Sequence, residues 1–177
     1  TEAIRETHAA IELGVTFFDT ADVYGCGHSE RVLAQALKGK RDQVVLATKF
    51  GNTYDEETKE ITGDDPSPEY MKKALEASLR RLETDYIDMY WLHIWGMPVE
   101  KAPALMEGLE EMVKAGKIRS YGWSTDLIEP IKAWNAGPNF GGVQQQLNVI
   151  ECSPGNDTDE ILEFCVADRK RTRLKSS

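Results

Sequence analysis

Short apolar runs alternate with amphipathic segments along almost the whole chain, and this alternation constrains the fold more than any other feature of the sequence. Five runs have the composition of strands, at residues 15–18, 43–49, 86–93, 117–124 and 141–150. Segments with helical periodicity lie between and around them, at residues 2–13, 30–39, 67–82, 99–115, 126–136 and from about residue 159. Residues 52–65 are polar and predict a loop.

Local signals indicate where several helices begin and end. Ser29 predicts an N-cap for the helix that follows it. Ser67 and Pro68 open the next helix, since proline is tolerated at the first helical position. Gly39 and Gly116 end two of the helices, because glycine readily adopts the backbone conformation that terminates a helix.

The regular order of these elements predicts the fold class. Strands that are each followed by a helix are typical of a parallel sheet with helical crossovers. The sequence therefore predicts an α/β fold of the (β/α)8 TIM-barrel type, incomplete, with about five strands and their helices. A doubly wound open sheet is the alternative, because it uses the same strand–helix repeat.

Polar residues stand at the end of every predicted strand. In both candidate folds the functional site forms at the carboxyl ends of parallel strands. Tyr24 follows the first strand within a short turn, so its side chain is expected to reach the same edge. The residues at the strand ends are Asp19, Thr48, Lys49, His93, Ser124, Thr125, Gln144, Gln145 and Gln146.

Four of these residues, Asp19, Tyr24, Lys49 and His93, form a set suited to proton transfer. An ammonium beside a phenol favours the phenolate, so Lys49 is expected to lower the pKa of Tyr24 and make it a usable general acid. Asp19 would hold Lys49 in place, and His93 would donate a hydrogen bond to an oxygen that gains charge. The set suits reduction of a carbonyl with a hydride that a cofactor supplies.

The sequence resembles the aldo-keto reductase superfamily from about residue 2 to about residue 165. The similarity is carried by "GVTFFDTADVYGCGHSERVLAQALKG", "VVLATKFG", "ASLRRLETDYIDMYWLH" and "GKIRSYGWST". The resemblance implies an NADP(H)-dependent oxidoreductase that reduces an aldehyde or ketone of a small molecule to an alcohol. It implies that Tyr24 is the proton donor, that Lys49 and Asp19 tune it, and that His93 orients the carbonyl.

The resemblance also implies a cofactor site. Ser124 and Gln144 match the residues that contact the nicotinamide carboxamide in this family, and Thr125 stands where the family has asparagine. A threonine hydroxyl can still make a hydrogen bond there. Trp95, two residues after His93, is a candidate for the wall of the substrate pocket, with a packing role as the alternative.

The chain departs from the family pattern in its extent. A barrel of this type has eight strands and typically needs about 250 residues, whereas this chain has 177 residues. The resemblance implies that its five predicted strands correspond to the second to sixth strands of the family's barrel. We expect residues 1–165 to form this partial barrel and residues 166–177 to form a basic tail without strand periodicity. Open sheet edges at residues 15–18 and 141–150 would then favour self-association. We also expect this chain to bind NADP(H) poorly and to turn over little or no substrate.

Composition narrows the range of partners. A net charge of −9 argues against a nucleic-acid ligand, and no apolar run approaches the roughly 20 residues of a membrane span. Three cysteines and a start without signal-peptide features predict a cytoplasmic protein. No metal site is expected, because the chain has three histidines and Cys26 with His28 provides too few ligands.

Two other function classes stay open at this point. A metal-dependent hydrolase on the same barrel would need several histidines at strand ends, and a metal assay would distinguish it. A non-catalytic fragment, or a regulatory or binding subunit with the same fold, would keep the architecture and lack turnover.

Overall fold

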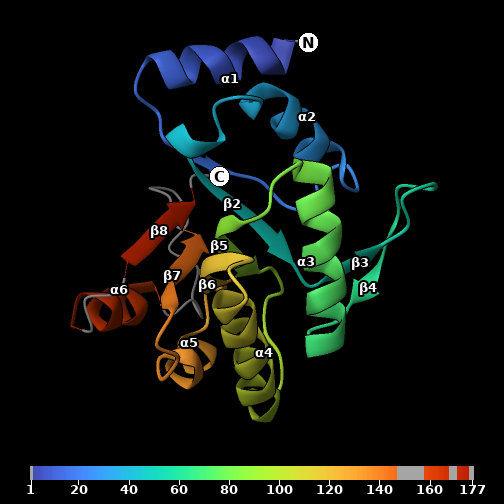
Figure 1. The fold of residues 1–177 in the computed structure, drawn as a ribbon. Helices are drawn as coiled ribbons and strands as arrows, with labels where there is room; N and C mark the ends of the chain where they lie inside the picture. Colours follow the sequence, from blue (N-terminus) through green and yellow to red (C-terminus); the bar gives the residue numbers. More distant parts are fainter. Residues whose placement is uncertain (1, 147–157, 168–170, 176–177) are drawn as a thin grey trace.

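The structure is a computed structural model that describes residues 2–146, 158–167 and 171–175 (Figure 1). Six strands form one parallel sheet in the order β1-β2-β5-β6-β7-β8. These strands are β1 (Phe17–Asp19), β2 (Val45–Phe50), β5 (Ile87–Leu92), β6 (Ile118–Ser124), β7 (Phe140–Gln146) and β8 (Arg171–Lys175). The predicted alternation of strands and helices is confirmed.

Helices connect the strands and cover the sheet. The α-helices are α1 (Glu2–Glu12), α2 (His28–Leu37), α3 (Pro68–Leu82), α4 (Ala102–Lys114), α5 (Ile128–Trp134) and α6 (Thr158–Ala167), with short 3₁₀-helices η1 (Arg41–Gln43) and η2 (Val99–Lys101). Each of α2, α3 and α4 contacts the next helix along the chain, so α2 to α5 form one continuous layer. A doubly wound sheet would reverse its strand order and place helices on both faces. The observed order favours part of a (β/α)8 barrel.

The two faces of the sheet carry different side chains because successive residues of a strand point to opposite sides. The face toward the helices contributes Leu46, Phe50 and Tyr90 to the large apolar core. The other face carries a smaller cluster of Ala47, Met89 and Trp91, against which Phe17 packs. Lys49 lies on this second face, two residues beyond Ala47 on the same strand.

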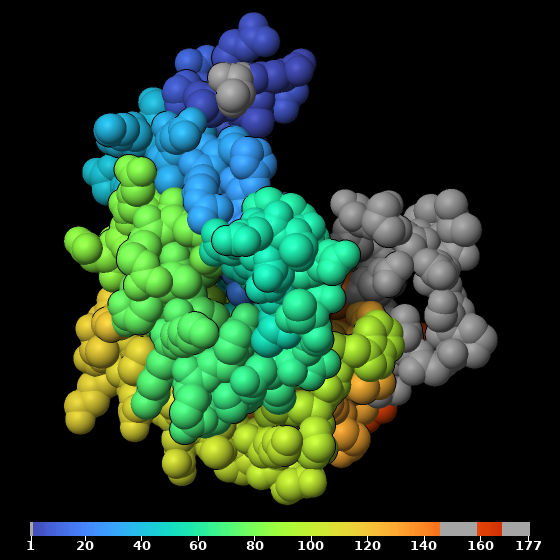
Figure 2. Space-filling model, turned by 90° about the vertical axis from the view of Figure 1, so that its right-hand side faces the viewer, coloured from blue at the N-terminus to red at the C-terminus, as the bar shows by residue number. Residues whose placement is uncertain are grey.

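A hairpin occupies the segment for which the sequence predicted a loop. Strands β3 (Asn52–Tyr54) and β4 (Ile61–Asp64) pair antiparallel, with a register shift between Thr53 and Tyr54. The hairpin lies beside α3 and near α2, as the space-filling view shows (Figure 2). The prediction missed it because the strands are only three and four residues long and β4 is exposed throughout.

The last strand also differs from expectation. Residues 166–177 were expected to form a basic tail without strands, yet α6 continues to Ala167 and β8 pairs parallel with β7. The strand beyond residue 140 is therefore not a sheet edge; within the described residues the two edges are β1 and β8. The part of the predicted strand at 147–150 lies outside the described residues.

Of the two predicted helix starts, the one at Ser67 is confirmed and the one at Ser29 is not. Ser67 caps α3 as expected, because its side chain accepts a hydrogen bond from the backbone N–H of Tyr70, and Pro68 is the first helical residue. The prediction for Ser29 is wrong: Gly27 occupies the N-cap position of α2 with a left-handed backbone. The Ser29 hydroxyl is instead 2.8 Å from the hydroxyl of Thr20.

Candidate active site

A buried ion pair joins the ends of the first two strands. Lys49 Nζ lies 2.6 Å from Asp19 Oδ2 and donates a second hydrogen bond of 2.6 Å to the carbonyl of Thr20. The Lys49 side chain is fully buried, and a buried ammonium is costly unless it is paired and hydrogen-bonded. The predicted pairing of Asp19 with Lys49 is therefore present in the structure.

Tyr24 reaches this ion pair from the turn after β1. The turn is closed by backbone hydrogen bonds, including Tyr24 N–H to the Ala21 carbonyl at 3.2 Å. The Tyr24 ring places its centroid 4.9 Å from Lys49 Nζ, and the side chain keeps part of its surface exposed to solvent. The phenol is thus beside the ammonium and accessible from outside.

The pKa of Tyr24 shifts in the direction opposite to the expected one. Partial burial raises the pKa of the Tyr24 phenol above its ordinary value, and the negative charge of Asp19 raises it further. Lys49 does not reverse this shift because its ammonium is 2.6 Å from the Asp19 carboxylate, which compensates its charge. A raised pKa keeps the phenol protonated at neutral pH, which is the form that can donate a proton.

His93 follows β5 and faces the same turn. Its backbone is held at both ends, because its N–H donates to the Phe50 carbonyl at 2.7 Å and its carbonyl accepts from Asn52 Nδ2 at 2.7 Å. The His93 ring meets the Tyr24 ring edge to face, with 5.8 Å between the ring centroids. Sequence reasoning missed Asn52, although its position just beyond the end of β2 could have suggested it.

Ser124 and Gln144 lie side by side on β6 and β7, where they are partners in the sheet register. Gln144 Nε2 lies 3.3 Å from Asp19 Oδ2, although three strands separate β7 from β1 in the sheet. This contact requires a strongly curved sheet, as in part of a barrel. Gln144 Oε1 is buried and has no hydrogen-bond partner among the described residues.

Thr125 and Trp95 contact each other rather than the ion pair. The Thr125 hydroxyl donates to the Trp95 carbonyl at 2.6 Å and accepts from the backbone N–H of Leu127 at 3.2 Å. These bonds tie the segment after β6 to the segment after β5. The Trp95 side chain itself is exposed. The hydroxyl of Thr125 is therefore engaged within the protein, whereas the neighbouring Gln144 keeps an acceptor atom available.

The described residues offer neither a metal site nor a membrane-spanning helix. Among these residues, no group of three or more His, Cys, Asp or Glu side chains could hold a metal ion. In the same part of the chain, every helix is too short or too polar to cross a membrane. The absence of a metal and of a membrane segment stays a prediction for the rest of the chain.

Comparison with known proteins identifies what this chain is similar to. A model of the aldo/keto reductase family matches residues 1–170. The aldo-keto reductase yakc [NADP(+)] of Schizosaccharomyces pombe is 43% identical over 152 residues, which cover 84% of this chain and 42% of that protein. The chain spans about half the length of the curated relatives it matches.

Solved structures agree with this family match. The holo form of aldo-keto reductase AKR11C1 from Bacillus halodurans superposes with a TM-score of 0.87 and 34% identity, covering 97% of this chain and 56% of that one. An aldo/keto reductase from Klebsiella pneumoniae, solved with NADP and acetate, has a TM-score of 0.75 and 32% identity over 97% of this chain and 58% of its own. The described strands and helices therefore match part of the fold of known aldo-keto reductases.

Proposed function

The chain belongs to the aldo/keto reductase family, and from this premise we propose that its strand-end residues reduce a small-molecule aldehyde or ketone with Tyr24 as the proton donor. The observation that carries the proposal is the convergence of two side chains on one phenol. Lys49 lies over the Tyr24 ring, and the His93 ring meets it edge to face. Lys49 belongs to β2 and His93 follows β5, the neighbouring strand. This convergence supports proton transfer to an oxygen held beside Tyr24.

Each side chain has a separate task in this proposal. Tyr24 gives its proton to the carbonyl oxygen as that oxygen gains negative charge. His93 donates a hydrogen bond to the same oxygen, and its fixed backbone keeps the ring directed toward the phenol. Lys49 stabilises the phenolate that remains after transfer, and Asp19 keeps Lys49 charged and in place.

The proposed cofactor is NADP(H), which the names of two of the similar proteins state for those proteins. Gln144 fits the nicotinamide carboxamide because its buried Oε1 has no hydrogen-bond partner among the described residues and can accept from an amide N–H. Ser124 stands next to it in the sheet register. When bound, NADPH supplies the hydride that no side chain can supply. Thr125, already bonded to Trp95, positions the adjoining loops.

Trp95 is proposed as part of the substrate pocket. It lies two residues beyond His93, and its side chain is 57% exposed, so it is free to cover an apolar portion of the substrate. Its carbonyl is anchored by Thr125, which limits how far the indole can move. The identity of the aldehyde or ketone would depend on such surfaces rather than on the proton-transfer residues.

Weak cofactor binding is proposed for residues 1–177 on their own. The chain matches about half of each curated relative, and in this family the phosphate end of the cofactor is expected to contact the other half. Binding energy from that remote end normally positions the reacting ring. Assays therefore need NADPH concentrations high enough to saturate a weak site.

Transfer of labelled hydrogen tests the reaction class directly. The chain is incubated with an aldehyde and NADPH that carries deuterium at its transferable hydrogen, and the alcohol is analysed by mass spectrometry. We expect one deuterium on the former carbonyl carbon. The matched control replaces Lys49 by Met and is expected to form much less labelled alcohol. Absence of labelled alcohol from the wild-type chain at saturating NADPH would contradict the proposal and favour a binding subunit without turnover.

A further inference from the structure

Glu30 is a fully buried carboxylate to which the proposed proton transfer assigns no role. Glu30, in the first turn of α2, accepts a hydrogen bond of 2.6 Å from Arg81 Nε on Oε2. Its Oε1 accepts a second hydrogen bond, of 2.7 Å, from the hydroxyl of Thr48. One side chain therefore joins helix α2, helix α3 and strand β2. Removing one partner of a buried ion pair is strongly destabilising, so we expect these contacts to persist in the folded protein.

The junction reaches the residue that precedes the catalytic lysine. Thr48 and Lys49 are neighbours on β2 and point to opposite faces of the sheet. Glu30 bonds Thr48 on the face of the sheet toward the helices, while Asp19 pairs with Lys49 on the opposite face. The end of β2 is thus fixed from both sides. A shift of β2 at Thr48 would move the Lys49 ammonium relative to Tyr24.

Arg81 also packs directly against residues 20–27, the turn that carries Tyr24 (the Tyr24 turn). Gly27, in this turn, has a left-handed φ of 82°, and a Cβ there would lie 2.7 Å from Arg81 Cδ. The backbone N–H of Gly27 donates to the Asp22 carbonyl at 2.6 Å, which closes the turn onto itself. The aliphatic part of the Arg81 side chain therefore packs closely against the backbone of the Tyr24 turn at Gly27.

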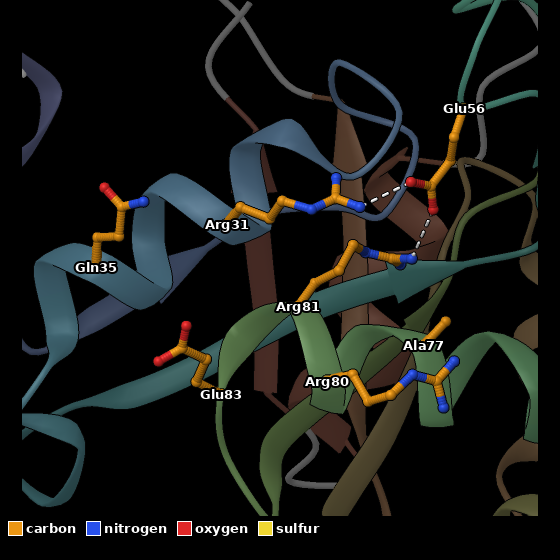
Figure 3. A pocket seen from close by; sticks show the side chains of 7 residues that line it. All are labelled: Arg31, Gln35, Glu56, Ala77, Arg80, Arg81 and Glu83. Atoms are coloured by element: carbon orange, nitrogen blue, oxygen red, sulfur yellow. Dashed lines mark hydrogen bonds and ion pairs between the residues drawn. The ribbon is translucent and has the colours of Figure 1, made fainter.

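The hairpin completes this arrangement on the outside. Figure 3 shows Arg31 and Arg81 both directed at Glu56, with contacts of 2.7 Å and 3.4 Å. The hydrogen bond from Arg31 lowers the pKa of Glu56, although the surrounding pocket of about 410 Å³ keeps this carboxylate open to solvent. Arg81 is thereby held between Glu30 on its buried side and Glu56 on its exposed side.

We propose that Glu30 and Arg81 are positioning residues for the proton transfer, because together they fix the Tyr24 turn and the end of β2 on which Lys49 lies. The inference rests on the proposed function for its consequence and on hydrogen bonds and packing for its geometry. The competing explanation is a structural ion pair that only fastens α2 to α3. The two explanations differ in what happens to Tyr24 when the protein stays folded.

The test variant is Glu30→Gln, which keeps the size of the side chain and removes the charge. Its matched control is Asp88→Asn, because Asp88 is also a buried acid, bonded to Arg41 Nη2 at 2.7 Å and to Leu46 N–H at 2.9 Å. Asp88 holds the start of β2, at Leu46, whereas Glu30 holds Thr48 near its end. Both variants are expected to lose stability, so stability alone cannot decide between the explanations.

The deciding readout is the titration of Tyr24 in the folded protein, followed by NMR of ¹³C-labelled tyrosine and assigned with a Tyr24→Phe sample. Three charged or titratable side chains face this ring, Asp19, Lys49 and His93. We expect the pKa of Tyr24 to fall toward its ordinary value in Glu30→Gln, because a released turn exposes the phenol. It should not move in Asp88→Asn. Turnover should fall about tenfold or more in Glu30→Gln, with the KM for the aldehyde little changed.

A second, milder variant keeps the test decisive if Glu30→Gln does not fold. Thr48→Val removes only the hydroxyl that donates to Glu30, and it should shift the titration of Tyr24 in the same direction by a smaller amount. An unchanged titration of Tyr24 in the folded variants overturns the proposal and leaves a structural ion pair. A wild-type chain without turnover would count against the proposed function alone, since the titration of Tyr24 needs no turnover.

Discussion

At the scale of single residues, the buried ammonium of Lys49 organises the site. The pairing of Lys49 with Asp19 could be predicted because a charged residue at the end of an apolar strand needs a partner. The direction of the Tyr24 pKa shift could not, since it depends on how far the folded turn buries the phenol. Asn52 and Glu30 escaped prediction for a similar reason: their partners are distant in sequence, at His93 and Thr48.

Replacing Lys49 by Met should destabilise the protein and impair catalysis together. The Asp19 carboxylate would remain largely buried without its partner, and breaking such a pair costs about 3–5 kcal/mol of unfolding free energy. Urea denaturation measures the loss. The double variant with Asp19→Asn should recover part of it, because the uncompensated charge is gone. Equal stability of wild type and Lys49→Met would contradict the structural role of the pair.

Asp22 should make stability depend on pH. Burial, together with the negative charge of Glu30, raises the pKa of Asp22 from 3.8 to about 8. The folded state then binds a proton that the unfolded state releases between these two values, so this group's contribution to stability declines as pH rises from about 3.8 to about 8. Above that window the loss is constant.

Asp22→Asn removes this titration and tests the effect. The variant should gain stability relative to the wild type as pH rises through the window, by several kcal/mol at most, because the amide stays neutral throughout. Denaturation at several pH values measures the difference, with Asp85→Asn as the control for an exposed acid. A difference between Asp22→Asn and wild type that does not vary with pH would refute the assigned shift.

At the scale of elements, the sequence predicted what depends on local signals and missed what depends on pairing between segments. The start of α3 followed from Ser67 and Pro68, whose effects act within one helical turn. The hairpin of β3 and β4 could not be recognised, because its short strands form through contacts with each other. Ser29 has the residue type of an N-cap, but its hydroxyl is hydrogen-bonded to the hydroxyl of Thr20, and Gly27 occupies the N-cap position of α2.

The cap of α3 offers a direct stability test. Ser67 accepts the Tyr70 N–H at 3.1 Å, so Ser67→Ala leaves that donor without its side-chain partner and should cost about 1 kcal/mol. Thr7→Ala is the control, because the Thr7 hydroxyl bonds the Ala3 carbonyl within α1 and caps nothing. Thermal or urea unfolding compares the two variants. A loss of the same size in both would show that the cap contributes nothing specific.

At the scale of the whole molecule, the order of the strands follows from the sequence but the curvature of the sheet does not. The repeated strand–helix pattern predicts parallel neighbours in chain order, as the structure shows. The contact between Gln144 and Asp19 depends on how the sheet curls, which emerges only when all strands pack. The pairing of β8 with β7 was missed because the sequence of Arg171–Lys175 is mostly polar.

Self-association is proposed at the β1 edge of the described sheet. Residues Leu13 and Val15, which lead into β1, are exposed apolar side chains beside a strand that pairs on one side only in the described structure. Sedimentation velocity should show association that increases with concentration, and Leu13→Lys and Val15→Lys should weaken it. The control is Val99→Lys, which changes an exposed apolar residue in η2. Association that persists equally in all variants would place the interface elsewhere.

Tyr24→Phe tests the central claim most directly, because it removes the proposed proton and keeps the ring that contacts Lys49 and His93. The measurement is the rate of aldehyde-dependent NADPH oxidation at saturating concentrations of both reactants, alongside Tyr54→Phe as a control tyrosine on the hairpin. We predict that Tyr24→Phe lowers turnover by about 100-fold or more with NADPH binding unchanged, whereas Tyr54→Phe keeps wild-type turnover. Wild-type turnover in Tyr24→Phe would contradict the assignment of Tyr24 as the proton donor.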